Sequence, residues 1–84
     1  MTRYTVVWPR DAEDDLANIW VDAPDRGLVT AATLVIDKEL ADDAPKKGVA
    51  VSEGLRAFYE PPLRVLFAVR EEDRTVEVLR VKHA

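Results

Sequence analysis

The octapeptide Leu63-Arg64-Val65-Leu66-Phe67-Ala68-Val69-Arg70 decides the fold. Its β-branched, aromatic and other apolar residues predict a β-strand. Because side chains alternate between the two faces of a strand, Leu63, Val65 and Phe67 are expected to face the core, with Arg64 on the opposite face. The polar segment 71–74 separates this strand from a second strand-like run at 75–82. The two strands are therefore expected to pair as an antiparallel hairpin.

Toward the N-terminus, the hydrophobic spacing changes from that of strands to that of helices. Five further elements are predicted: a strand over 2–8, a helix from Pro9 to about Asp22, a second helix from the corner at 24–25 to about Asp42, a loop over 43–48, and a strand over 55–60. The resulting order β-α-α-β-β-β predicts an α+β fold, with a helical hairpin packed on one face of a small, mostly antiparallel sheet.

The composition limits the organisation and the chemistry of the protein. The chain has 84 residues, of which 48% are hydrophobic, so we expect one folded domain over 1–84. The sequence contains no cysteine and one histidine, which argues against disulfides, thiolate zinc sites and histidine-rich metal cages. The N-terminal apolar run is too short for a signal peptide, and no stretch approaches a membrane span. We therefore expect a soluble cytoplasmic protein that needs no cofactor and has no membrane partner.

The net charge of −4 is unevenly distributed along the chain. Residues 1–44 hold four basic and ten acidic side chains, whereas residues 45–84 hold eight basic and six acidic ones. Because nucleic acids attract clustered Lys and Arg, any nucleic-acid site is expected in the second half. The acids at the start of the first helix are explained by the helix dipole, and no metal site is predicted there.

Four basic side chains could form one cationic patch on the sheet face away from the helices: Arg56, Arg64, Arg80 and Lys82. Such a patch would suit a phosphate group. The alternative is that these are solvated strand residues paired with nearby carboxylates: Glu53, Glu60 and Glu77.

His83 is a candidate for acid-base chemistry, because histidine exchanges a proton nearest to neutral pH. Beside Arg56 or Arg64 and a carboxylate, it would complete the groups needed for RNA cleavage by its own 2′-hydroxyl. One group takes the hydroxyl proton, one protonates the leaving oxygen, and a cation stabilises the pentavalent phosphate. The alternative is a solvent-exposed histidine close to the C-terminus.

Several short motifs occur in an order that resembles the RelE/ParE superfamily of bacterial toxins: Tyr4-Thr5-Val6-Val7-Trp8, Asp15-Leu16, Ile19-Trp20, Gly54-Leu55-Arg56, Leu63-Arg64-Val65-Leu66-Phe67 and Val78-Leu79-Arg80-Val81-Lys82-His83. The resemblance implies the toxin half of a type II toxin-antitoxin pair, neutralised by a small antitoxin. Members of the RelE branch cleave messenger RNA on the ribosome, and those of the ParE branch poison DNA gyrase.

The resemblance also implies roles for individual residues. Arg64 matches the arginine of the central strand that contacts the scissile phosphate, Arg56 a basic position one strand earlier, and His83 a histidine that closes the last strand. With Arg80 and Lys82 as substrate-binding residues, these form the expected site. The activity implied is mRNA cleavage, with gyrase inhibition or antitoxin binding without toxic activity as alternatives. Operator DNA would be reached only through the antitoxin, which is expected to fill an apolar groove beside the helical hairpin.

Overall fold

The computed structural model describes residues 3–83 of the chain. In chain order its elements are β1 (Thr5–Val7), α1 (Arg10–Asp22), α2 (Arg26–Ala41), a short 3-10 helix η1 (Ala44–Lys46), β2 (Val49–Ser52), β3 (Leu55–Glu60), β4 (Leu63–Arg70) and β5 (Thr75–His83). The predicted α+β architecture is confirmed. β2 adds one strand to the predicted order, and Thr2, the predicted start of the first strand, lies outside the described residues.

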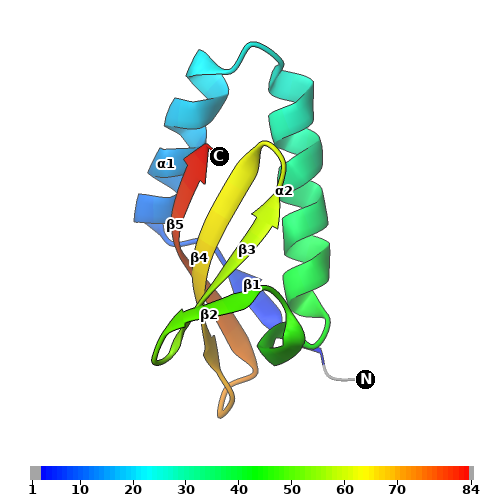
Figure 1. The fold of residues 1–84 in the computed structure, drawn as a ribbon, viewed down its shortest axis with the longest axis vertical. Coiled ribbons are helices and arrows are strands. Elements are labelled where there is room, and N and C mark those ends of the chain that lie inside the picture. Colours follow the sequence, from blue (N-terminus) through cyan, green and yellow to red (C-terminus); the bar gives the residue numbers. More distant parts are fainter. Residues whose placement is uncertain (1–2, 84) are drawn as a thin grey trace.

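The five strands form one mixed sheet in the order β1-β5-β4-β3-β2. β2, β3, β4 and β5 pair antiparallel with their neighbours, while β1 pairs parallel with β5. In Figure 1 the two helices flank the β3–β4 hairpin, and the C-terminal end of β5 lies beside α1. The sheet is therefore mostly antiparallel, as predicted.

The helical hairpin is shaped by residues at the ends of its two helices. α1 begins directly after Pro9, which has no N–H to leave unsatisfied at a helix start. The side chain of Asp25 caps α2 by accepting a hydrogen bond from the Leu28 amide at 3.2 Å. Arg26 then reaches back and donates to the carbonyl oxygens of Trp20 and Val21 at 3.1 and 3.2 Å. One arginine thus satisfies the end of α1 and joins the two helices.

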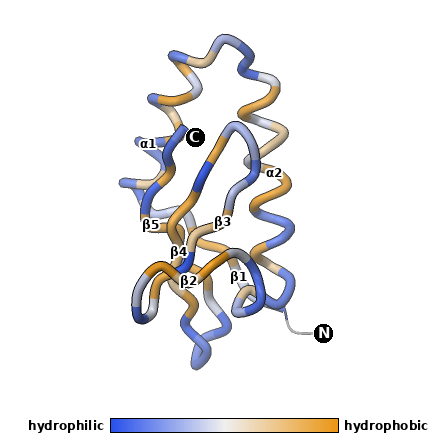
Figure 2. Tube along the Cα trace, in the orientation of Figure 1, coloured by the Kyte–Doolittle hydropathy of each residue, from blue (hydrophilic) through white to orange (hydrophobic). Residues whose placement is uncertain are grey.

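The core lies between the helices and one face of the sheet. Its fully buried side chains from α2, β4 and β5 include Val29, Ile36, Leu40, Leu63, Val65, Phe67, Val76 and Val78. The apolar residues of α2 recur every three or four positions, so they share one helical face, and apolar segments run through α2 and β4 in Figure 2. Each such side chain stabilises the fold by about 1.5–3 kcal/mol through burial.

α1 lies along the part of the β5 edge that is not paired with β1. β1 is short and its pairing with β5 ends at the partners Val7 and Glu77. Beyond that point the Val81 amide donates a hydrogen bond to the Asp15 carboxylate of α1 at 3.0 Å. A helix carboxylate therefore takes the place of a strand carbonyl at this edge, which protects it from unwanted pairing.

Candidate functional site

The strand register assigns the side chains of β4 to two faces. Leu63, Val65 and Phe67 are fully buried beneath the helices, whereas Arg64 is exposed on the other side, here called the open face. Residues directly opposite each other in antiparallel strands share a face, with Cβ atoms about 5 Å apart. Arg64 pairs with Tyr59 of β3 and with Lys82 of β5. An aromatic ring, a guanidinium and an ammonium therefore form one row across three adjacent strands.

A β-bulge in β5 brings Lys82 and Arg80 to the open face. The β4–β5 register shifts between Leu66, which pairs with Arg80, and Phe67, which pairs with Val78. Leu79 is the extra residue of β5 and has no partner in β4. Without this extra residue, regular alternation would place Lys82 on the same face as the buried Val78. The bulge re-aims the end of β5 so that its cations join Arg64.

Four residues of this face line a hollow of about 340 Å³: Arg64, Leu66, Arg80 and Lys82. The predicted gathering of late basic residues is thus confirmed for three of its four members. We call this hollow the cationic hollow, and its positive charge suits an anion such as a phosphate group.

The three cations of the hollow are not equivalent. Arg80 donates from Nε and Nη2 to the two Asp15 carboxylate oxygens at 2.7 and 2.9 Å. Hydrogen bonds from Arg80 and from the Val81 amide lower the pKa of Asp15, and the same carboxylate raises the pKa of Arg80. Arg64 and Lys82 form no ion pair with any residue of the described chain 3–83. These two side chains are therefore the cations available to a ligand.

Within residues 3–83, none of the three predicted carboxylate partners pairs with a basic residue of the predicted patch. Glu77 pairs with Arg70 at 2.8 Å, near the opposite end of β4 from Arg64. Neither Glu53 nor Glu60 forms an ion pair within residues 3–83. The carboxylate that does reach the cationic hollow is Asp15 of α1, which only the three-dimensional packing brings there.

Solved structures of low sequence identity share this fold. A chain of the toxin-antitoxin complex RelBE2 from Mycobacterium tuberculosis superposes with a TM-score of 0.82 at 23% identity, covering 100% of this chain and 94% of that chain. A chain of the chromosomal ParDE system from P. aeruginosa gives 0.74 at 20% identity, covering 98% and 97%. The protein has a RelE/ParE-like fold. A conserved hypothetical protein from Helicobacter pylori also matches, with a TM-score of 0.59 at 16% identity, covering 95% and 93%.

The sequence comparisons add nothing to this structural relationship. No protein-family model matches the chain. The search of curated proteins likewise returned no match. The RelE/ParE-like fold, which the sequence motifs resemble, is thus shown by the structural comparison alone.

Arg56 occupies a different place in the RelE/ParE fold from the one predicted. It pairs with Phe67, so its side chain lies on the helix side of the sheet, opposite Arg64. Its Nε and Nη2 donate to the carbonyl oxygens of Lys47 and Gly48 at 2.8 and 3.1 Å. The prediction that Arg56 joins the cationic patch is therefore wrong. Its guanidinium fastens the chain that leads into β2.

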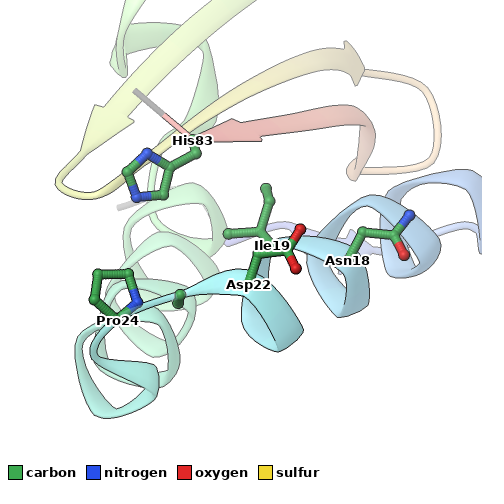
Figure 3. A pocket seen from close by; sticks show the side chains of 6 residues that line it. Asn18, Ile19, Asp22, Pro24 and His83 are labelled. Atoms are coloured by element: carbon green, nitrogen blue, oxygen red, sulfur yellow. The ribbon is translucent and has the colours of Figure 1, made fainter.

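His83 also lies away from the cationic hollow. It pairs with Leu63, which places it on the helix side of the sheet. There it lines a hollow of about 360 Å³ with residues from the end of α1 and the helical turn, including Ile19, Asp22 and Pro24 (Figure 3). The expected grouping of His83 with Arg64 is wrong, because neighbouring positions on a strand point to opposite faces.

Tyr59 is the residue of the open face that sequence reasoning missed. It is 59% exposed and lies directly across from Arg64. The sequence contained the information needed to find Tyr59, because a tight turn at 61–62 connects the two strands and sets Tyr59 opposite Arg64.

Two further features are absent from residues 3–83, a metal-binding cluster and a helix able to cross a membrane. Within residues 3–83, no group of three or more His, Asp or Glu side chains is arranged to hold a metal ion. No helix in that part of the chain is long and apolar enough to cross a membrane.

Proposed function

We propose that this protein is the toxin half of a type II toxin-antitoxin pair, and that it inhibits translation by binding and cleaving messenger RNA on its open face. The observation that carries this proposal is the cross-strand pair of Arg64 and Lys82, two exposed cations without ion-pair partners among residues 3–83. Phosphate binding by such cations supplies most of the affinity of proteins for nucleic acids.

Arg64 has the geometry suited to the scissile phosphate. A guanidinium presents a planar fork of N–H donors that matches two phosphate oxygens. The backbone of Arg64 belongs to β4, the central strand of the sheet. The 2′-hydroxyl gives its proton to solvent water, its oxygen bonds to the adjacent phosphorus, and the bond from phosphorus to the 5′-oxygen breaks, so that negative charge grows on the phosphate oxygens. A fixed cation at that point lowers the barrier. In this proposal Lys82, the cross-strand partner of Arg64, gives a proton to the departing oxygen.

One observation favours a second candidate, the binding of DNA gyrase without RNA cleavage. The row of Arg64 contains no carboxylate or imidazole that could take the proton of a 2′-hydroxyl, as far as residues 3–83 are concerned. Glu77 lies on the open face and Asp15 reaches the cationic hollow, but both carboxylates are bound to arginines, Arg70 and Arg80. A cationic face without an available general base can still bind a protein partner such as gyrase tightly.

The partner implied by this function is an antitoxin that covers apolar side chains. Large hydrophobic residues are exposed on the helices and their turn, among them Val21 at 61%, Leu28 at 57% and Leu34 at 67%. An amphipathic segment of the antitoxin would bury them. Since the chain is itself acidic, with a net charge of −4, this complex should depend on apolar burial and resist salt. We place the protein in the cytoplasm, with operator DNA reached through the antitoxin.

Induced expression of wild type and two variants tests the function. Arg64→Ala removes the proposed phosphate ligand, and Arg70→Ala is a matched control, since Arg70 lies on the same face of β4 but is paired with Glu77. We expect growth arrest with shortened transcripts for wild type and Arg70→Ala, and normal growth for Arg64→Ala. Intact transcripts with blocked gyrase supercoiling would establish the second candidate. Unimpaired growth of cells expressing the wild-type protein would leave antitoxin binding as its remaining function.

A further inference from the structure

A second hollow adjoins the cationic hollow on the open face. It measures about 410 Å³ and is lined largely by apolar and aromatic side chains, including Val49, Val51 and Tyr59, with Arg64 at its margin. We call it the apolar hollow. Arg64 lines both hollows, so an aromatic surface and a phosphate-binding surface meet at one side chain.

The apolar side chains of this hollow are exposed to an unusual extent. Val49 is 69% exposed, Val51 47% and Tyr59 59%, and all three line the same hollow. Single exposed apolar residues are common, but a contiguous group beside a cation marks a binding surface. The core does not need Tyr59, because its ring lies on the side of the sheet that the helices do not cover.

We infer that the apolar hollow binds a nucleobase of single-stranded RNA, stacked on Tyr59, while Arg64 binds the phosphate of the same strand. This inference rests on the proposed function and adds to it a second contact, with a different chemistry. Single-stranded nucleic acids are bound by this combination of aromatic stacking and a cationic track along the backbone.

The charges of the face favour RNA over an apolar peptide as the occupant. The row continues from Tyr59 through Arg64 to Lys82, so an occupant of the apolar hollow that carries negative charge at one end can also bind these cations. In a nucleotide the charge and the flat apolar surface belong to one small unit. Stacking tolerates any base, because every base has a π-face, so the hollow predicts little preference among base sequences.

The test uses the full chain and two fluorescent five-nucleotide strands, one of RNA and one with the same backbone but no bases. Tyr59→Leu keeps an apolar side chain but removes the ring, and Tyr59→Phe keeps the ring. Trp20→Leu is a matched control, since Trp20 is also aromatic and 42% exposed but lies on α1. Binding is followed by fluorescence anisotropy, and folding of each variant by circular dichroism.

We expect Tyr59→Leu to weaken RNA binding about tenfold and to leave binding of the baseless strand unchanged. Tyr59→Phe and Trp20→Leu should bind RNA as wild type does. Equal affinity of wild type for the two strands, or wild-type affinity of Tyr59→Leu for RNA, would overturn the stacking inference and leave the proposed function standing. If the wild-type protein binds neither strand, the RNA-directed function itself is wrong.

Discussion

The Asp15 carboxylate of α1 holds the Arg80 guanidinium of β5 by two hydrogen bonds, at 2.7 and 2.9 Å. One of its oxygens also accepts a hydrogen bond from the Val81 amide at 3.0 Å. One side chain thus joins a helix to a strand edge and neutralises a cation on the open face. Arg80 lines the cationic hollow but already has an anionic partner, so it differs functionally from Arg64.

Removal of the Asp15 carboxylate should destabilise the fold. Asp15→Ala leaves the Val81 amide without its partner and separates the end of β5 from α1. We expect the free energy of unfolding to fall by about 1 kcal/mol, the usual scale for a charged hydrogen bond at a partly exposed site. Urea denaturation measures this. The neighbouring Asp14→Ala is the control, because Asp14 is exposed and forms no ion pair with residues 3–83. Equal stability of the two variants would contradict the role of Asp15.

The same contact predicts a pH dependence. The pKa of Asp15 lies below its ordinary value of 3.8, mainly because of the hydrogen bond from Arg80. A carboxyl whose pKa is lower in the folded state contributes stability above its unfolded pKa and loses it as the pH falls through the folded pKa. The difference in unfolding free energy between wild type and Asp15→Asn should therefore be constant from about pH 7 to 5 and shrink below about 3.8. Chemical denaturation across this pH range measures the difference in unfolding free energy. A difference that grows in acid would contradict the contact between Asp15 and Arg80.

The three cations should differ in the salt dependence of RNA binding. Each phosphate contact in single-stranded nucleic acid contributes about −0.7 to the slope of log affinity against log salt. Arg64→Ala and Lys82→Ala should each reduce that slope by about 0.7, whereas Arg80→Ala should change it less and lower stability instead. Titrations of a short RNA at four salt concentrations measure this. A full loss for Arg80→Ala would show that phosphate displaces Asp15.

The fold could be predicted from local patterns, because its strongest elements carry their own periodicity. The alternation in β4 and the three- and four-residue spacing in α2 identify a strand and a helix without tertiary information. β2 was missed because its four residues, Val49–Ser52, form a short run of mainly apolar residues that periodicity alone does not assign to a strand. Its pairing with β3 gives it a strand conformation that its own pattern does not indicate.

The site was predicted in part, because faces depend on register. The pairing of Arg64 with Lys82 follows from the hairpin, but the bulge at Leu79 sets which residues of β5 face outward. The sequence carries one sign of this bulge. The buried valines change from even positions, Val76 and Val78, to the odd position Val81. The placement of Asp15 depends on the packing of α1 against β5, which no local pattern specifies.

Gly48 should tolerate substitution less well than Gly54. Both have positive φ, at 67° and 79°, a conformation that costs other residues about 1–2 kcal/mol. A Cβ on Gly48 would also collide with the carbonyl oxygen of Ala57, whereas one on Gly54 would meet open space. We expect Gly54→Ala to destabilise the protein by about 1 kcal/mol and Gly48→Ala by at least twice that amount. Thermal unfolding compares the stabilities of the two variants. Similar losses of stability would contradict the close approach of Gly48 to the Ala57 carbonyl oxygen.

Arg56 should act on structure and leave RNA binding unchanged. Its guanidinium donates to two carbonyl oxygens before β2, so Arg56→Ala leaves both acceptors unsatisfied and should loosen β2. Arg56→Lys should rescue little, because a lysine ammonium lacks the planar fork that spans Lys47 and Gly48.

Hydrogen exchange distinguishes this structural role from a role in phosphate binding. We expect faster exchange of the β2 and β3 amides in Arg56→Ala, together with an RNA affinity and salt slope close to those of wild type. Arg64→Ala should give the opposite result, with unchanged exchange and weakened RNA binding. If Arg56→Ala lost RNA affinity while its amides stayed protected, Arg56 would have to contact the ligand directly. That would require its side chain to leave the helix side of the sheet.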